Sequence, residues 1–479
     1  MLTQQIRRSL FISGALALLL SGCRTLDPSS EIAQAAAVVA ERSGALSEWS
    51  KPPPARPLGR TLTIGEAIER ALMVHPTLRR DIARVAAARA DLVAHDRLPN
   101  PVLSFGIGTP FDGGGGSPLS GGLLAPLTAL VTRPARVAAA EASLRAEVLA
   151  LADQALRTIE TVSVQCAQVH HGRLRVALDT REVELLTEHV QIIRMIVDAG
   201  EAGRATWDAA RVELAHAADR LIQSRTALAL HERALLEALG AIETLEECPE
   251  IDPTSLPSLA ADSVQIPDEH ALIGMVALRR LDVAAAVARA ESAGRKLRVV
   301  SRGRFGAVGG TLGLERNFDG REAIKTGLTF EVPIFDFGGA RVAKADAERT
   351  ALVYEAEIAL WNGYLEARSS RAQVVGTRER LAGLTAHWLP AAHAHARLIA
   401  ETAAAGEASR PEAIHAEALA IAADRVFNET ALEGAQALFS LARTAGGTFA
   451  PLTQGEVDRI DVLPDPPPLA HSGDEGRGR

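Results

Sequence analysis

Cysteine is scarce in this chain of 479 residues, which contains three. Cys166 falls in a predicted helix and Cys248 in a proline-rich segment, so we expect both thiols to be free and no disulfide framework to hold the fold. Beyond the first 22 residues, no apolar run reaches the roughly 20 residues that a transmembrane helix needs. If this chain crosses a membrane, it must therefore do so with β-strands.

An excess of basic charge and a catalytic grouping are also missing. The net charge is −8, which argues against a nucleic-acid-binding surface. Histidines cluster at 170–171 and at 387, 393 and 395. Adjacent residues on a helix point in different directions and residues two apart do not share a face, so solvated helix positions explain these histidines better than metal ligation does. The sequence predicts no enzyme, no cofactor and no metal site.

The N-terminus has the features of a secretory signal. Arg7 and Arg8 precede an apolar run at 10–20, which is too short to span a bilayer as a stable helix. The run closes with Leu20-Ser21-Gly22-Cys23. This ending resembles the bacterial lipoprotein signal, in which the cysteine thiol takes a diacylglyceryl group before cleavage and the new N-terminus is then acylated. An ordinary signal peptide with an accidental cysteine is the alternative.

The lipoprotein resemblance predicts a signal peptide at 1–22 and an acylated mature N-terminus at Cys23. Several acyl chains anchor a protein stably, whereas a single chain binds a membrane only reversibly. Arg24 follows the cysteine, in place of the Asp that tends to retain such lipoproteins in the inner membrane. The resemblance therefore implies delivery to the outer membrane.

The chain repeats itself after about two hundred residues. Leu78-Arg79-Arg80 returns as Leu278-Arg279-Arg280, and Ala135-Arg136-Val137-Ala138 returns as Ala340-Arg341-Val342-Ala343. Ala199-Gly200-Glu201-Ala202-Gly203-Arg204 returns as Ala405-Gly406-Glu407-Ala408-Ser409-Arg410. A chance similarity between alanine-rich helices would give one such match, whereas several in the same order at a nearly constant shift predict a duplicated module.

Each copy contains a helix that is too long for a globular domain. Between Pro134 and Ala199 the sequence has no further proline and a single glycine, and a rise of about 1.5 Å per residue makes this helix on the order of 100 Å long. A second helix returns after a turn at 200–203 and runs to Gly240. Its leucines at 214, 221, 228 and 235 recur every seven residues, which predicts an antiparallel coiled-coil seam rather than a solvent-exposed single helix.

The predicted organisation follows from this duplication. Each repeat opens with a shorter helix, at 62–97 with a capping box from Thr63 to Glu66, and at about 270–297. In the second repeat a long helix is predicted at 340–404 and a returning helix at 411–445. The segments are a signal peptide (1–22), an extended, lipid-anchored, Pro-rich tether (23–60), a first repeat (61–240), a connector (241–268), a second repeat (269–446) and a disordered tail (447–479).

Two glycine-rich zones, at 101–132 and 299–339, are the predicted β-hairpins. From Ala323 to Pro333 the residues alternate, and the predicted lipid-facing set is Ile324, Leu328, Phe330 and Val332. A half-buried strand of a soluble sheet gives the same alternation, but the lipoprotein signal and the paired hairpins favour a membrane strand of about ten residues. Four strands from one chain cannot close a barrel around a pore. The pore must therefore be an oligomer.

The chain resembles the TolC-like outer-membrane efflux family over about residues 62–445. Leu62-Thr63-Ile64-Gly65-Glu66-Ala67-Ile68 with His75-Pro76 resembles the family's opening helix, and Leu98-Pro99-Asn100-Pro101 resembles its approach to the first strand. Val332-Pro333-Ile334-Phe335-Asp336-Phe337-Gly338-Gly339 resembles its passage from strand to helix. The first repeat departs from this pattern with Thr132-Arg133-Pro134, and tyrosine is almost absent, so the usual aromatic girdle is weak.

The resemblance implies a mainly α fold with a small β part, in which duplicated helical hairpins form a periplasmic tunnel. It implies a homotrimer whose four strands per chain build a twelve-stranded barrel, and partners in a periplasmic adaptor, an inner-membrane pump and outer-membrane lipid. The expected function is a passive exit duct for small molecules or metal ions. The alternative is a lipid-anchored periplasmic coiled-coil adaptor or scaffold without its own pore.

The two glycine turns are the predicted periplasmic tip. The residues expected to meet the adaptor are Gly200, Glu201, Arg204, Gly406, Glu407 and Arg410. Asp198 and Glu401, together with Glu201 and Glu407, would form rings of carboxylates in a trimer, and such rings favour cations. Ordinary cap and surface charge explains these carboxylates equally well.

Overall fold

A computed structural model describes residues 26–44, 49, 59–108, 117–240, 248–259, 265–304, 306–317, 319–332 and 334–447. The predicted signal peptide, Cys23 and nearly all of the predicted tail lie outside these residues. The chain divides into two compact units. The described residues of unit 1 lie within 26–34, 81–148 and 291–349, and those of unit 2 lie within 35–80, 149–290 and 350–447.

Helices dominate the described part of the chain. Those of the first repeat are α3 (Ile64–Val74), α4 (Pro76–Asp96), α5 (Thr128–Asp198) and α6 (Arg204–Ala238). Those of the second repeat are α7 (Glu269–Arg279), α8 (Leu281–Arg302), α9 (Gly339–Gly383), α10 (Leu389–Ala404) and α11 (Arg410–Thr444). No helix among the described residues is long and apolar enough to cross a membrane.

The opening helix of each repeat is broken into two, which corrects the predicted single helices at 62–97 and 270–297. Thr63 and Glu66 form the predicted capping box at the start of α3. The chain then becomes extended at His75, because a residue before proline is disfavoured in the helical region. Arg280 takes the same extended conformation in the second repeat without a following proline, and its guanidinium there binds the Asp282 carboxylate at 2.6 Å.

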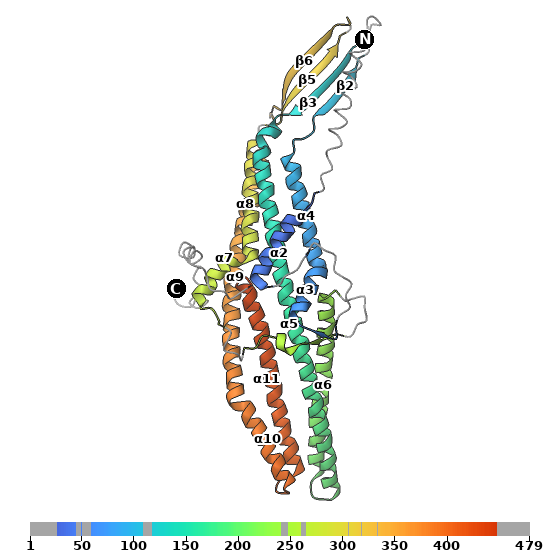
Figure 1. Cartoon of the computed structure of the whole chain (residues 1–479), viewed down its shortest axis with the longest axis vertical. Coiled ribbons are helices and arrows are strands. Elements are labelled where there is room, and N and C mark those ends of the chain that lie inside the picture. The colour runs from blue at the N-terminus through green and yellow to red at the C-terminus, as the bar shows by residue number, and fades with distance from the viewer. Residues whose placement is uncertain are drawn as a thin grey trace, which may run out of the picture. The chain divides into compact units, whose positions relative to one another are not determined.

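The 71-residue helix α5 begins six residues before the predicted start, and Pro134 lies inside it. Its return partner α6 runs alongside it in unit 2 (Figure 1). Leu221 and Leu235 of the heptad are buried, and Leu214 and Leu228 are half-buried. A Cβ atom on Gly172 of α5 would lie 3.2 Å from the Leu228 side chain, so the small residue lets the two helices approach closely.

The predicted continuous helix at 340–404 is interrupted, which is a second correction. A π-helical turn at Leu384–Trp388 separates α9 from α10. Pro390 follows in the first turn of α10. Proline lacks an N–H group and its ring collides with the carbonyl four residues earlier, so the chain widens into a π-turn at this point.

A helix and a pair of short strands were not predicted. Residues Ser29–Ser43 form helix α2, in the tether that the sequence led us to expect as extended. The run of alanines in this segment explains the helix, since alanine has the highest helix propensity. In unit 2, strand β1 (Thr61–Leu62) pairs in parallel with β4 (Glu250–Ile251), which brings the predicted connector back to the first residues of the repeat.

The core of unit 2 consists of separate apolar clusters along its helices. One surrounds Val162 and Leu235 and joins α3, α5, α6 and β4. A second surrounds Met275 and Leu441 and joins α7, α9 and α11. A third, around Leu185 and Ile414, joins α5 to α11. Leu185 and Ile414 therefore connect the hairpin of the first repeat to that of the second.

Unit 1 contains a four-stranded antiparallel sheet. Its strands are β2 (Val102–Ile107), β3 (Leu119–Pro126), β5 (Val308–Arg316) and β6 (Glu322–Phe330), in the order β2-β3-β5-β6. The strands fall within the two glycine-rich zones. The last residues of the first zone, 128–132, belong instead to the beginning of α5.

Candidate functional site

One face of the unit 1 sheet is apolar and exposed. Register places Phe105 opposite Gly121, Gly121 opposite Leu314, and Leu314 opposite Ile324, so all four share this face. Ile324, Leu328 and Phe330 are 72%, 69% and 69% exposed. The other large apolar residues of this face are Leu103, Ile107, Leu119, Leu123, Val308 and Leu312. An apolar surface of this extent marks an interaction or membrane-contact site rather than ordinary solvent-exposed surface.

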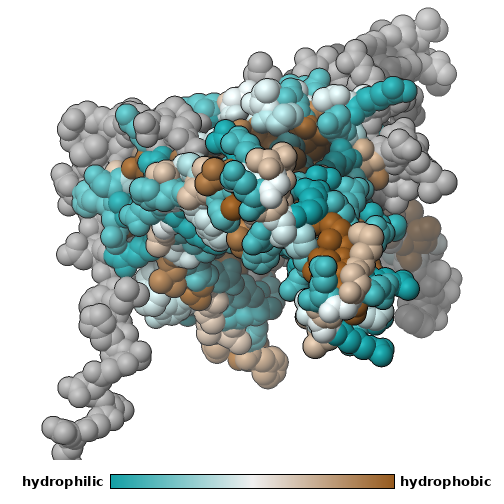
Figure 2. All heavy atoms as spheres, turned by 90° about the horizontal axis from the view of Figure 1, so that it is seen from below, coloured by the Kyte–Doolittle hydropathy of each residue, from teal (hydrophilic) through white to brown (hydrophobic). Residues whose placement is uncertain are grey.

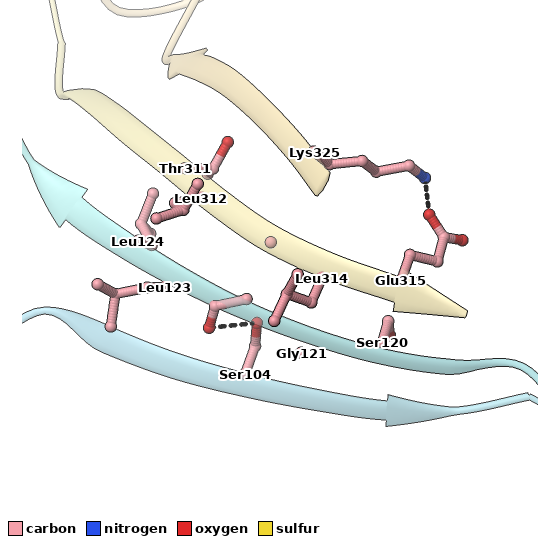
Figure 3. Close-up of a pocket in the computed structure, with 12 residues that line it drawn as sticks. Ser104, Ser120, Gly121, Leu123, Leu124, Thr311, Leu312, Leu314, Glu315 and Lys325 are labelled. Carbon is pink, nitrogen blue, oxygen red and sulfur yellow. Dashed lines mark hydrogen bonds and ion pairs between the residues drawn. The ribbon is translucent and has the colours of Figure 1, made fainter. Parts of the chain in front are cut away.

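The opposite face, which we call the polar face, carries hydroxyl groups set against glycines. Ser104 lies opposite Gly122, and its Oγ donates a hydrogen bond to the Gly122 carbonyl oxygen at 3.2 Å (Figure 3). Thr329 lies opposite Gly309 in the second hairpin. Glu315 and Lys325 also lie on this face and form an ion pair (Figure 3). A shallow pocket lies on the sheet, and most of the residues that line it belong to the polar face.

The structure places the predicted lipid-facing residues as follows. Ile324, Leu328 and Phe330 lie on the apolar face of β6. Val332 is exposed but lies beyond the strand, which ends at Phe330, so its assignment to the strand was wrong. Among the described residues, β2 and β6 each have one neighbouring strand, which leaves two edges of the sheet open.

The two predicted tip turns have the same backbone geometry, and both lie at one end of the hairpins of unit 2 (Figure 1). Gly200 and Gly406 both have φ of 80°. The Glu201 amide donates to the Ile196 carbonyl at 3.1 Å, and the Glu407 amide donates to the Thr402 carbonyl at 2.9 Å. This is the helix-ending motif that needs a left-handed residue, for which glycine is preferred.

The side chains around the two turns differ. Ser409 forms a capping box with Glu412 at the start of α11, whereas Gly203 offers no side chain to cap α6. Arg410 donates two hydrogen bonds to Glu188 of α5, at 2.7 and 2.8 Å, which raises the pKa of Arg410 and lowers that of Glu188. Among the described residues, the ion-pair partner of Arg204 is Asp208 of its own helix, at 3.9 Å. The duplicated arginines therefore have different roles in the monomer.

The remaining predicted tip residues are exposed. Asp198 ends α5 with a side chain that is 72% accessible and lies 3.7 Å from Arg194. Glu201, Glu401 and Glu407 are exposed as well. The molecule seen from below presents mainly hydrophilic spheres, with smaller hydrophobic patches between them (Figure 2).

A buried ion cluster joins the two hairpins of unit 2. Asp179 of α5 has a fully buried side chain and accepts hydrogen bonds from Arg175 at 3.0 Å and from Arg425 of α11 at 2.9 Å. Glu182, one turn further along α5, accepts from Arg220 of α6 at 2.7 Å and also binds Arg425. Sequence analysis missed this cluster. The signal in the sequence that could have indicated it is the spacing of Asp179 and Glu182, which lie three residues apart in a helix too long to be exposed to solvent on all sides.

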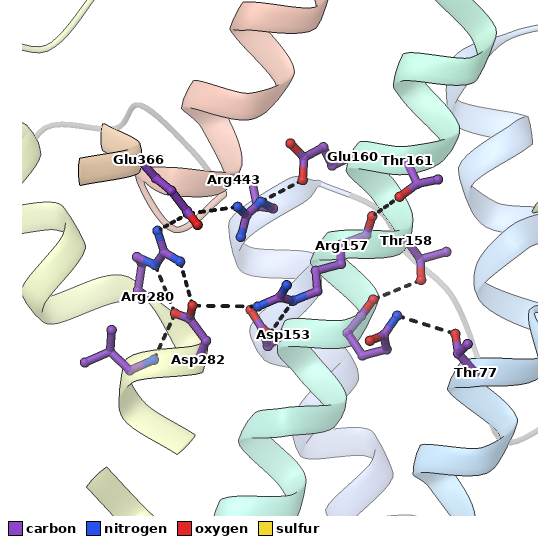
Figure 4. Close-up of polar contacts among 12 residues, drawn as sticks. Thr77, Asp153, Arg157, Thr158, Glu160, Thr161, Arg280, Asp282, Glu366 and Arg443 are labelled. Carbon is purple, nitrogen blue, oxygen red and sulfur yellow. Dashed lines mark hydrogen bonds and ion pairs between the residues drawn. The ribbon is translucent and has the colours of Figure 1, made fainter. Parts of the chain in front are cut away.

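A second cluster joins α5, α8, α9 and α11 in unit 2, with Arg280 between α7 and α8 (Figure 4). Arg280 binds Glu366 at 2.7 Å as well as Asp282, and Glu366 also accepts from Arg443 at 3.0 Å. Burial alone would raise the pKa of Asp282, but the hydrogen bonds and charge of Arg280, together with the Val283 amide and the charge of Arg157, lower it. Burial dominates at Glu160, so its pKa is raised although Arg443 lies beside it. These ion pairs fix the junction between the helices.

Two cysteines and the adjacent histidines of the described chain occupy structural positions. Cys166 and Cys248 are both free. Burial raises their pKa values to about 12 and about 11, so both are weak nucleophiles. His171 accepts or donates a hydrogen bond at Asn428 and packs edge-on against His170. Within the described ranges, no group of three or more His, Cys, Asp or Glu side chains is arranged to hold a metal ion.

The structure of this chain is similar to several solved protein structures. No protein-family model and no curated protein matches the sequence. The outer-membrane channel OprN aligns with a TM-score of 0.66 and 21% identity, over 81% of this chain and 91% of OprN. CusC, whose structures concern transmembrane channel formation, aligns at 0.64 and 17%, over 83% and 98%. The open state of the Neisseria gonorrhoeae MtrE outer membrane channel aligns at 0.64 and 18%, over 80% and 89%.

These similarities establish the fold. The chain has the TolC-like fold of long helices with few strands, and the predicted fold class is confirmed at this level.

Proposed function

We propose that this chain is the outer-membrane exit duct of a tripartite efflux system, and that it carries small molecules or metal ions passively to the cell exterior. In this proposal the chain forms a homotrimer, is anchored by lipid at Cys23, and receives its cargo from an inner-membrane pump through a periplasmic adaptor. The fold shared with outer-membrane channels supports the location and the class of function.

The single observation that carries the proposal is the two-faced sheet of unit 1. Its apolar face is exposed over all four strands, whereas its polar face carries mostly small and hydroxyl-bearing residues and the Glu315–Lys325 pair. A membrane barrel needs this division, with apolar side chains toward lipid and polar ones toward water. The open edges at β2 and β6 favour closure by strands of other copies, because lipid-exposed sheet edges are not tolerated in a membrane.

The hairpin turns support the adaptor contact. Gly200 and Gly406 close two hairpins with the same backbone geometry at one end of unit 2. Three copies would present six such turns. A ring of helical hairpin ends suits contact with an adaptor that also ends in helical hairpins.

The alternative, a lipid-anchored adaptor or scaffold without a pore, does not explain the sheet. A soluble β domain would cover one face with a helix or a second sheet, whereas here the large apolar residues of one face are exposed. No residue grouping in the described part of the chain supports an enzyme.

A planar bilayer experiment tests the proposal. The purified full-length chain, added to one side of a lipid bilayer, should produce stepwise conductance that persists after the membrane is washed at high pH. An adaptor or scaffold held only by its acyl chains would associate with the membrane and leave its conductance unchanged, and that outcome would contradict the proposal.

A further inference from the structure

The polar face of the unit 1 sheet carries its charge in a single cross-strand pair. The four strands contain the charged residues Glu315, Arg316, Glu322 and Lys325. Glu315 and Lys325 lie on the polar face and form an ion pair (Figure 3). Arg316 and Glu322 lie directly opposite each other on the apolar face, at the end of their strands. Each face of the sheet therefore has no net charge from its strand residues.

Apart from Val102 and Leu124 at one end, the rest of the polar face carries small residues and hydroxyl groups and no further charge. A Cβ atom added to Gly122 would lie 2.9 Å from the Ser104 hydroxyl, and one added to Gly309 would lie 2.6 Å from the Thr329 hydroxyl. Similar contacts would arise between Gly106 and Ser120 and between Gly327 and Thr311. Residues larger than glycine would collide with these hydroxyl groups. Glu315 and Lys325 are consequently the long charged side chains that rise from this face.

We propose that Glu315 and Lys325 set the charge preference of the duct wall, and that their pairing makes this wall indifferent to the sign of a solute's charge. This rests on the proposed function, because it requires the polar face to line a duct. A paired carboxylate and ammonium present no net charge to a passing solute. If either is removed, the other remains uncompensated, and the copies of an assembly would repeat it as a charged ring of the kind that selects ions.

The thiol that reports on this charge is placed at Ser120. Register sets Ser120 directly opposite Glu315 on the polar face, and such pairs have Cβ atoms about 5 Å apart. The full-length chain with Ser120→Cys, in outer-membrane vesicles, is treated with a cationic and with an anionic methanethiosulfonate reagent, and the two rates are compared. The high pKa values of Cys166 and Cys248, about 12 and about 11, keep native thiols slow, and the chain without Ser120→Cys gives the background.

The ratio of cation to anion rates should respond to each member of the pair. Glu315→Gln should lower the ratio and Lys325→Gln should raise it, each by about tenfold, because a unit charge some 6 Å away in water changes each of the two rates by about threefold and in opposite directions. The double variant should return the ratio to its starting value. Arg321→Gln, in the turn where Arg321 lies 3.6 Å from Asp319, should leave the ratio unchanged.

The outcomes separate the two proposals. An unchanged ratio in both single variants would overturn the role of Glu315 and Lys325, while the reaction at Ser120→Cys would still support a water-filled duct. The matched control is Leu314→Cys, next to Glu315 on β5 but on the apolar face. Lipid should protect this cysteine from both reagents. Reaction at Leu314→Cys without reaction at Ser120→Cys would contradict the proposed function itself, and this inference with it.

Discussion

At the scale of single residues, charge is placed in two contrasting ways. Asp179 is fully buried and is neutralised by Arg175 and Arg425. Asp198, on the same helix, is mostly exposed and lies at the edge of contact with Arg194. Loss of the charge should affect stability differently at the two positions, because a buried carboxylate depends on its ion-pair partners whereas water solvates an exposed one.

Replacing Asp179 should therefore destabilise the hairpins of unit 2. Asp179→Ala leaves Arg425 and Arg175 without their shared buried partner, and we expect a loss of about 3–5 kcal/mol in the free energy of unfolding. The measurement is the midpoint of thermal unfolding followed by helical circular dichroism. Asp198→Ala is the matched control and should cost less than about 1 kcal/mol, so equal midpoints for the two variants would contradict the prediction.

Cys23 is the second prediction at this scale, and it lies outside the described residues. The sequence Leu20-Ser21-Gly22-Cys23 predicts an acylated mature N-terminus. Mass spectrometry of the mature protein should find a lipid-modified peptide that begins at Cys23, and Cys23→Ser should block processing. An unmodified peptide beginning at another residue would show that the signal is of the ordinary secretory type.

At the scale of elements, strand β6 should respond to charge on one face only. Leu328→Arg places a cation among the exposed apolar side chains and should cost roughly 2–4 kcal/mol at mid-membrane. Thr329→Arg places the same cation on the polar face, beside Gly309, and should assemble nearly normally. The fraction of heat-resistant assembly on gels measures both. The reverse order would mean that the polar face meets lipid.

The turns between helices give a second prediction for elements. A Cβ atom on Gly200 or Gly406 would meet no heavy atom within 4 Å, so a large side chain would project from the turn without a clash inside the monomer. Gly200→Trp or Gly406→Trp should abolish export while membrane insertion and assembly continue. Gly200→Ala imposes the left-handed backbone strain without the bulk, at a cost of about 1–2 kcal/mol. The Gly200→Ala variant should retain most of its export. Loss of export in both Gly200→Trp and Gly200→Ala would mean that a distorted turn, and not the added bulk, is the cause.

At the scale of the whole molecule, we expect the open sheet edges to determine how copies assemble. Four strands leave β2 and β6 available, and three copies give the twelve strands that the TolC-like resemblance implies. Native mass spectrometry in detergent should find three chains, and cysteines placed on β2 and β6 should cross-link between copies. A stable monomer that conducts ions would refute this assembly.

The sequence by itself determined the pattern that repeats. The duplication, the long helices, the paired hairpins and the two glycine turns were all predicted, because each depends on local spacing and on residues such as Gly200 and Gly406 that local geometry demands. The apolar alternation in β6 was predicted for the same reason, although its end at Phe330 was not, since hydrogen bonding to a neighbouring strand decides where a strand stops.

Tertiary structure alone decided which distant side chains meet. Asp179 lies beside Arg425, and Arg410 binds Glu188 while its repeat counterpart Arg204 does not. Neither contact follows from spacing, because both depend on which faces of two long helices turn toward each other. The Glu315–Lys325 pair likewise required the register of β5 against β6, since a shift of one residue would have placed the two charges on opposite faces of the sheet.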